Sequence, residues 1–172
     1  MEFNSALLTG GLVALEPINT QHLEGLQLAA SAPKLWHYIP FALNDPSIME
    51  LYVGHVSSSP EKGEGQAYAI RHNETGRVIG GSGYWHIDHQ NNKLEIGGSW
   101  LMEDFQRSGV NTEVKYLLLK NAFEVLGCNR VGFSIDARNE KSLRAIERIG
   151  ATKEGVLRCD MVMHDGSLRD SA

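Results

Sequence analysis

The residues best placed to do chemistry lie at a junction past the middle of the chain. An apolar run that ends at Leu101 leads into a polar turn, residues 106–111, and a helical pattern follows from Val110. Ser108 and Gly109 are typical of a helix start. The first N–H groups of a helix have no partner within it and lie at the positive end of the helix dipole. The junction therefore predicts an anion site, with phosphate as the ligand that fits it.

Other motifs that bind nucleotides or metals are weaker. The chain has no Gly-x4-Gly-Lys-Ser/Thr loop, and residues 80–83 lack the third glycine of a dinucleotide-binding loop. His86, Asp88 and His89 could each bind a metal, but on a strand His86 and Asp88 share one face while His89 faces away. No further Cys or His cluster completes a set. A solvated turn is therefore favoured here, and no metal is expected.

The composition restricts the class of protein. A chain of 172 residues without repeats or linkers suits one domain, residues 1–172. A formal net charge of −5 without a long basic run argues against nucleic acid as a partner and permits a cationic small molecule or peptide. Cys128 and Cys159 are interpreted as thiols of a reducing compartment. No signal peptide or membrane-length apolar run is apparent, so a cytoplasmic location and no membrane partner are expected.

The elements that must position the junction follow from hydrophobic periodicity. A strand is expected at 93–101, where Gly97 and Gly98 indicate a bulge or a splayed strand. The helix after the junction is expected to end near Gly127, with Val125 on its buried face. A strand at 130–135 follows, so the two strands should be parallel. The other expected elements are a strand at 12–15, a helix from Thr20 to Ala30, a helix from Asp45 or Ser47 to Val56, a loop at 57–65, a hairpin of 66–71 and 77–84, a helix at 142–149, and a strand at 151–163 with one apolar face.

The turn also resembles a family signature. Residues 106–111, Gln-Arg-Ser-Gly-Val-Asn, are similar to the Gln/Arg-x-x-Gly-x-Gly/Ala motif of the GCN5-related N-acetyltransferases (GNAT), in which the turn grips the pyrophosphate of acetyl-coenzyme A. Asn111 departs from the Gly or Ala of that motif, which implies a side chain near the phosphates or a slightly wider turn. Residues 100–119 and 136–142 resemble the branch of ribosomal-protein N-terminal acetyltransferases and their relatives. The match covers nearly the whole chain.

The resemblance implies a fold and a reaction. Together with the order of the elements, it predicts an α+β fold: a mixed, mostly antiparallel sheet, flanked by helices, whose central parallel pair splays to admit the pantetheine arm. The implied activity is transfer of acetyl from acetyl-coenzyme A to a primary amine, on a protein or peptide N-terminus or a small molecule, by direct attack in a ternary complex. A non-catalytic acyl-coenzyme A binding or sensing domain is the alternative. Neither the acyl length nor the acceptor can be deduced from the sequence.

The resemblance also assigns roles to residues, each with a plainer alternative. Glu95 would be the general base, or a solvated strand carboxylate. Ser142 would lie near the sulfur, or be an ordinary first-turn residue. Many family members supply a tyrosine acid after the second crossover helix, but residues 148–152 contain none, so Ser142 and water both stay open as the acid. Contacts with acetyl-coenzyme A are expected from Trp100, Leu101, Gln106, Arg107, Ser108, Gly109, Val110, Asn111, Thr112 and Asn139, the last of which could instead be only a helix cap.

Two segments carry further expectations. Residues 35–41 are dense in aromatic side chains and form either a hydrophobic lid or a wall of the acceptor pocket. The acceptor pocket is expected to include Trp36, Tyr38, Phe41 and Trp85. After a turn at Asp165 and Gly166 only residues 167–172 remain, where family members continue into a further strand. Three outcomes are open: a shortened form, an edge covered by a second subunit in a homodimer, or a short strand that suffices.

Overall fold

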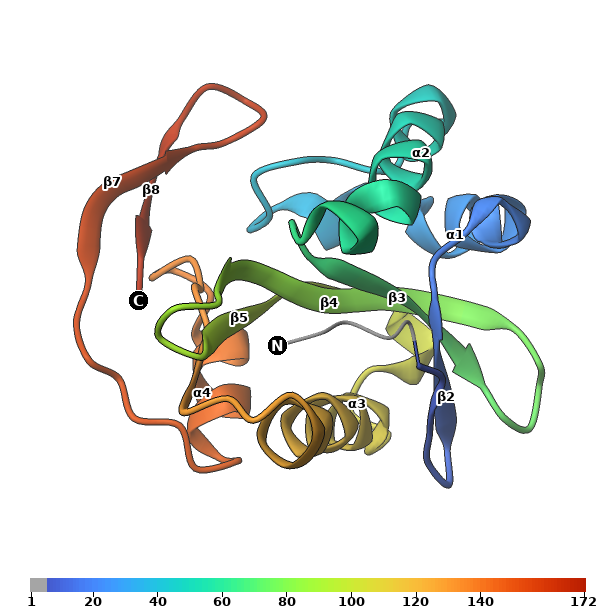
Figure 1. The fold of residues 1–172 in the computed structure, drawn as a ribbon. Helices are drawn as coiled ribbons and strands as arrows, with labels where there is room; N and C mark the ends of the chain where they lie inside the picture. The colour runs from blue at the N-terminus through green and yellow to red at the C-terminus, as the bar shows by residue number, and fades with distance from the viewer. Residues whose placement is uncertain (1–5) are drawn as a thin grey trace.

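The core of the fold is a six-stranded sheet, seen in a computed structural model that describes residues 6–172 (Figure 1). Its strands follow one another in chain order and pair antiparallel, except that the last two are parallel. They are β1 (Leu8–Thr9), β2 (Val13–Pro17), β3 (Gln66–His72), β4 (Val78–Asp88), β5 (Lys93–Leu101) and β6 (Arg130–Gly132).

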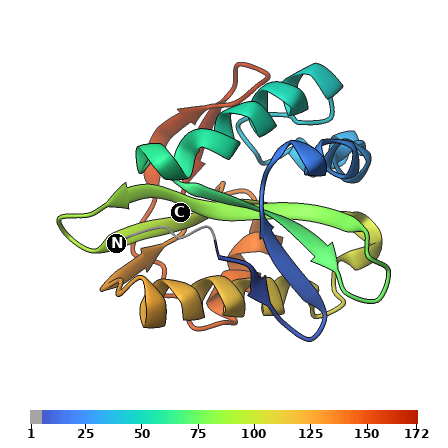
Figure 2. The same ribbon diagram turned by 45° about the vertical axis from the view of Figure 1, so that its right-hand side comes forward.

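Helices cover both faces of this sheet. Helices α1 (Leu23–Ala30) and α2 (Pro46–Lys62) lie over one face, and α3 (Val110–Lys120) lies over the other with α4 (Glu140–Glu147) beside it (Figures 1 and 2). Each face has its own apolar core, one centred on Tyr84 and Leu118 and one on Trp36 and Trp100. The predicted α+β fold, with its mixed sheet and flanking helices, is confirmed.

The first two helices differ from expectation at their ends. Asn19, not Thr20, caps the first helical segment, because its side chain accepts a hydrogen bond from the Gln21 N–H and the segment opens as a 3₁₀ turn. Helix α2 begins after Asp45 as predicted but continues to Lys62, so residues 57–62, expected in a loop, are helical. Pro60 lies in the last turn of α2 and leaves one position of the hydrogen-bond ladder without a donor, because proline has no N–H. The helix ends at Gly63, which has a φ of +70°.

Helix α3 contains an irregularity that its periodicity did not predict. A π-helical turn, Asn121–Val125, follows Lys120. A π turn holds more residues than an α turn, so the positions that follow are rotated away from the expected face. Val125, expected to be buried, is 64% exposed, and Leu126 is buried in its place.

The C-terminal part differs most. The strand expected at 130–135 ends at Gly132, and the strand expected at 151–163 is β7 (Leu157–Val162), which pairs with β8 (Leu168–Ser171) apart from the main sheet (Figure 1). The expected apolar face is wrong, since Leu157 is 65% exposed. A register shift between Leu157 and Met161, with Cys159 at a φ of +52°, breaks the alternation of faces.

A short strand does follow the turn at Asp165 and Gly166. Besides its pairing with β7, the backbone of Ala172 exchanges two hydrogen bonds with Ile135, and Ser171 bridges to Asp136. Of the three outcomes open at this point, the short strand is the one seen in the structure, where β8 pairs with β7. Self-association as a homodimer stays a prediction.

No helix in residues 6–172 is both long enough and apolar enough to cross a membrane.

Candidate functional site

The predicted anion site is a turn in which most of the backbone N–H groups have no hydrogen-bond partner among the described residues. After a 3₁₀ turn at Glu103–Phe105, Arg107 adopts a φ of +61° and Gly109 a φ of +87° at the start of α3, which no side chain caps. In the part of the chain that the structure describes, the N–H groups of residues 107–112 have no hydrogen-bond partner. The N–H of Gln106, expected to join them, instead donates to the Glu103 carbonyl because the preceding 3₁₀ turn uses it.

Cationic side chains surround this turn. Arg107 is exposed, and two further cations reach the turn from α4 and the residue that follows it. Lys141 Nζ donates to Gln106 Oε1 at 2.5 Å, and Arg148 donates to the Thr112 hydroxyl at 2.8 Å. Three positive charges and a row of free N–H groups at the positive end of a helix dipole make the site electrostatically suited to a pyrophosphate.

Lys141 and Arg148 were missed by the sequence analysis, although their spacing carried a signal. Residues seven apart lie on one face of a helix, so both can approach the same turn.

The interior of the turn is held by its own polar groups. Gln106 donates its amide N–H to the Leu101 carbonyl at 2.9 Å, and the Ser108 hydroxyl donates to the Phe105 carbonyl at 2.6 Å.

Not every residue expected to contact the cosubstrate can do so with its side chain. Trp100, Leu101 and Val110 are buried in the apolar cores, so only their backbone groups are available. Asn111 and Thr112 are half-buried in the first turn of α3. The carboxylate of Glu113, in the same turn, accepts hydrogen bonds from the N–H groups of residues 11–13 and ties the β1–β2 turn to α3.

The predicted splay lies between β5 and β6. The two strands pair over three residues, ending at Glu95 and Gly132, and β5 then continues to Leu101 without a neighbour on that side in the described chain. A β-bulge follows, because the register on β4 advances two residues between Gly97 and Trp100 where β5 advances three. Gly98, with a φ of +57°, accommodates this bulge. The expectation of a bulge and a splay at this pair of glycines is confirmed.

Glu95 lies where the parallel pairing ends. Its Oε2 is 3.0 Å from His86 Nδ1, and the Glu95 side chain is 35% exposed. A pocket of about 260 Å³ opens beside it, lined by His86, Lys93, Leu94, Glu95, Arg130, Gly132 and Phe133. The carboxylate therefore meets solvent at the edge of the splay, where a base would have to meet an acceptor amine. Among the described residues, no group of three or more His, Cys, Asp or Glu side chains is arranged to hold a metal.

Asn139 and Ser142 lie at the start of α4. Asn139 caps the helix, because its Oδ1 accepts the Ser142 N–H at 3.1 Å. The Ser142 hydroxyl makes no hydrogen bond within the described chain. Since Lys141 contacts Gln106, the N-terminus of α4 adjoins the anion turn and brings Ser142 near it. Asn139 therefore caps α4, and this role is compatible with the expected contact between its amide and acetyl-coenzyme A.

The four aromatic residues expected in the acceptor pocket separate into two groups. Trp36 is 1% exposed, packs on Trp100 with ring centroids 5.3 Å apart, and donates its indole N–H to the Ala30 carbonyl. It belongs to the core, so its expected place in a pocket wall is wrong. Tyr38 is half-buried, Phe41 is partly exposed, and Trp85 packs over Gly97 and Gly98. The buried indole N–H of Trp85 has no partner among the described residues.

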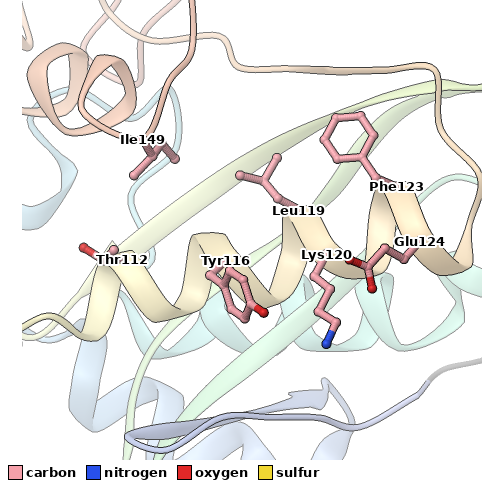
Figure 3. Close-up of a pocket in the computed structure, with 7 residues that line it drawn as sticks. All are labelled: Thr112, Tyr116, Leu119, Lys120, Phe123, Glu124 and Ile149. Carbon is pink, nitrogen blue, oxygen red and sulfur yellow. The ribbon is translucent and has the colours of Figure 1, made fainter.

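A second pocket, of about 330 Å³, lies on the outer face of α3 (Figure 3). It is mostly apolar and starts at Thr112, beside the anion turn. It shares no lining residue with the pocket at Glu95, so it is not where that carboxylate could act. Its lining residues are Thr112, Tyr116, Leu119, Lys120, Phe123, Glu124 and Ile149.

Comparisons with known proteins agree with this fold. A crystal structure of a GCN5-related N-acetyltransferase from Brucella melitensis superposes with a TM-score of 0.91, at 27% identity, covering 99% of this chain and 78% of that one. A structure described as a candidate acetyltransferase from T. thermophilus gives a TM-score of 0.85 at 33% identity, covering 99% of this chain and 88% of that one.

Curated relatives match over a shorter stretch. YdaF of Bacillus subtilis (strain 168), whose name describes it as a candidate ribosomal N-acetyltransferase, is 37% identical over 83 residues, 48% of this chain and 45% of YdaF. The match to the curated relatives spans about half their length. The profile of the family described as "Acetyltransferase (GNAT) domain" matches residues 13–152. The chain therefore belongs to the GNAT acetyltransferase family, as its resemblance to the family signature indicated.

Proposed function

We propose that residues 1–172 form one acetyltransferase domain that transfers acetyl from acetyl-coenzyme A to a primary amine by direct attack in a ternary complex. One observation carries the proposal: the free N–H groups at the start of α3 adjoin a splay of β5 and β6 that has a carboxylate, Glu95, at its edge. Family membership agrees with it. An anion grip, an open strand edge and a base are three of the parts that such a transfer needs.

The residues present suit acetyl-coenzyme A. The N–H groups of residues 107–112, with Arg107, Lys141 and Arg148, would hold the pyrophosphate. The open edge of β5 beyond Glu95 offers unpaired backbone groups to the amide groups of the pantetheine arm. When bound, the cosubstrate supplies an acetyl thioester, whose sulfur leaves more readily than an alkoxide does. Asn139 adds an amide at the N-terminus of α4.

Glu95 removes the proton that keeps the acceptor amine from attacking. An amine is protonated near neutral pH, so a carboxylate within hydrogen-bond reach, directly or through one water, is needed. Backbone N–H groups between Gly98 and Trp100 stabilise the charge that develops on the carbonyl oxygen. Ser142 donates a hydrogen bond to the departing sulfur, since its hydroxyl has no partner in the described chain.

The acceptor is an amine on a protein or peptide N-terminus or on a small molecule. The half-buried Tyr38, the partly exposed Phe41 and Trp85 are the aromatic side chains available to line its site. The name of YdaF, a candidate ribosomal N-acetyltransferase, favours a protein N-terminus. The net charge of −5 suits a cationic acceptor.

A non-catalytic acyl-coenzyme A sensor is the competing function, since it would keep the anion turn and need no base. Calorimetry with coenzyme A, combined with release of free thiol from acetyl-coenzyme A in the presence of an amine panel, separates the two. Tight binding without thiol release for any amine or N-terminal peptide would support the sensor. Mass spectrometry of products acetylated in a cell extract would then identify the acceptor class.

A further inference from the structure

Lys115 is a buried lysine without a carboxylate partner. It lies in the second turn of α3, is 4% exposed, and places its Nζ 2.5 Å from Ser99 Oγ and 3.5 Å from Ser82 Oγ. The Phe133 ring centroid is 5.9 Å away. In the part of the chain that the structure describes, no acidic side chain forms an ion pair with it. Burying an unpaired ammonium group is unfavourable, so this arrangement needs an explanation.

The surroundings of Lys115 place it at the base of the splay. Ser99 lies on β5 beyond Glu95, where β5 no longer pairs with β6, and Phe133 is the first residue after β6 ends. Lys115 therefore contacts β4 and β5 from α3, beside the point where β5 and β6 diverge. Ser99 is half-buried, whereas Lys115 and Ser82 are buried. The Ser99 hydroxyl is thus the member of this cluster that a group in the splay would meet first.

Burial also prepares Lys115 to exchange a proton near neutral pH. Removal from water disfavours the ammonium form and lowers the pKa of Lys115 to about 7. No charged neighbour opposes this effect in the described chain. The titratable or charged groups on the elements packed against it make their recorded contacts elsewhere: Glu113 on α3, Tyr84 on β4, Glu95 on β5, and Asp136 after β6.

We propose that Lys115, acting through the Ser99 hydroxyl, supplies the proton to the sulfur of coenzyme A as it leaves. This inference rests on the proposed acetyl transfer. The amine nitrogen forms a bond to the carbonyl carbon, the carbon–sulfur bond breaks with its electron pair on sulfur, and Ser99 passes a proton to sulfur while it takes one from Lys115. Glu95 takes the proton that the amine loses, and Lys115 regains one from solvent through Ser99.

A purely structural role explains the cluster less well. The hydroxyls of Ser82 and Ser99 are 2.7 Å apart and can satisfy each other without a lysine. An apolar side chain such as Met would fill the same space without the cost of a buried amine. A proton donor is also the part that the site otherwise lacks, because a serine hydroxyl such as that of Ser142 is a poor acid.

The test compares Lys115→Met with Lys120→Met, which removes an exposed lysine from the same helix. The ratio of wild-type to variant kcat/KM for one amine at saturating acetyl-coenzyme A is measured from pH 6 to 9, so that ionisation of the amine cancels. For Lys115→Met we expect a ratio of roughly 10–100 at pH 6 that falls toward one as Lys115 loses its proton above about pH 7. The KM for acetyl-coenzyme A should change less than about twofold, and Ser99→Ala should show the same pH dependence.

A wild-type to Lys115→Met ratio that stays constant with pH would overturn the inference while leaving acetyl transfer intact. An effect of Lys115→Met that is confined to the KM for acetyl-coenzyme A would do the same. A readout without turnover is the ultraviolet absorbance of the thiolate of bound coenzyme A. Because the Lys115 ammonium favours the thiolate, the pKa of the thiol of bound coenzyme A should be at least about one unit lower in wild type than in Lys115→Met. Equal titrations would refute the inference alone, and a wild-type protein that does not bind coenzyme A would refute it together with the proposed function.

Discussion

His86 Nδ1 and Glu95 Oε2 are 3.0 Å apart at the point where the parallel pairing of β5 and β6 ends. The contact depends on an irregular step in the β4–β5 register after Trp85, where His86 adopts a φ of +48°. The His86 side chain is 65% exposed, so it links the partly covered Glu95 carboxylate to solvent. In the proposed mechanism, the pair would give a proton taken from an amine a path away from the site.

Replacing the carboxylate tests this role. Glu95→Gln keeps the size of the side chain and removes its basicity, so we expect kcat to fall by roughly 10²–10⁴-fold. The affinity for coenzyme A should be kept. Thiol release from acetyl-coenzyme A measures the rate, with Glu64→Gln as an exposed control. Near-normal kcat from pH 6 to 9 would mean that solvent deprotonates the amine.

The cations of α4 and its C-terminal end should control affinity for the cosubstrate. Lys141→Met and Arg148→Met each remove a charge that contacts the anion turn, so each should raise the KM for acetyl-coenzyme A by roughly 3–30-fold with little change in kcat. The effect should shrink at high salt. Arg144→Met is the matched control, because Arg144 pairs with Glu140 on the helix surface. An equal effect in all three variants would show a general charge effect and no specific anion site.

Gly109 offers a less selective test of the same turn. We expect Gly109→Val to raise the KM for acetyl-coenzyme A more than it lowers the thermal stability of the free protein. A Cβ at this position would make only an ordinary contact, 3.7 Å from Leu12 Cδ1, but the φ of +87° strains any β-branched residue. Thermal melts without ligand, compared with the KM, measure both effects. Comparable losses would mean that the turn is mainly structural.

The parts of the site that the sequence predicted are those set by local chain geometry. The anion turn, the bulge at Gly98 and the cap at Asn139 each depend on a few consecutive residues, so motif and spacing suffice. Composition could not separate Trp36, which is a core residue, from Phe41, which is exposed, because both lie in one aromatic segment. Burial depends on which element docks against them.

Features that depend on contacts between distant segments of the chain have no recognisable pattern in the sequence. Lys115 interrupts an apolar helical face and would ordinarily be solvated, but its buried amine contacts serines on two separate strands. Glu113 looks like a surface residue until the β1–β2 turn is placed against α3. The exposure of Val125 requires the π turn, which no periodicity predicts.

Glu113 should be important for stability. Its carboxylate accepts three backbone N–H groups at 2.7 to 2.9 Å, and Glu113→Gln leaves one acceptor oxygen where there were two. We expect the free energy of unfolding to fall by about 1–3 kcal/mol, measured by urea denaturation. Glu124→Gln, an exposed change near the end of the same helix, should leave it within about 0.5 kcal/mol. No difference between the two variants would contradict a clamp on the β1–β2 turn.

Glu16 should make stability depend on acidic pH. Arg71 holds its carboxylate through two hydrogen bonds of 2.8 Å, and His22 approaches it at 2.9 Å. The bond to Arg71 is the main cause that lowers the pKa of Glu16 to about 2 in the folded protein, from 4.5. Between these values the unfolded chain binds more protons than the folded one, so stability falls as pH drops. The contribution is complete above about pH 5 and is lost as pH falls toward 2.

The comparison of wild type with Glu16→Gln isolates this contribution. Because the pair is partly exposed, we expect a loss of only about 1–2 kcal/mol at pH 7, measured by urea denaturation. The difference between the two proteins should shrink steadily from pH 5 to pH 2.5, whereas Glu50→Gln, an exposed change on α2, should differ little from wild type throughout. A difference that stays the same from pH 7 to pH 3 would show that Glu16 stabilises the fold through packing, because packing does not depend on protonation of the carboxylate.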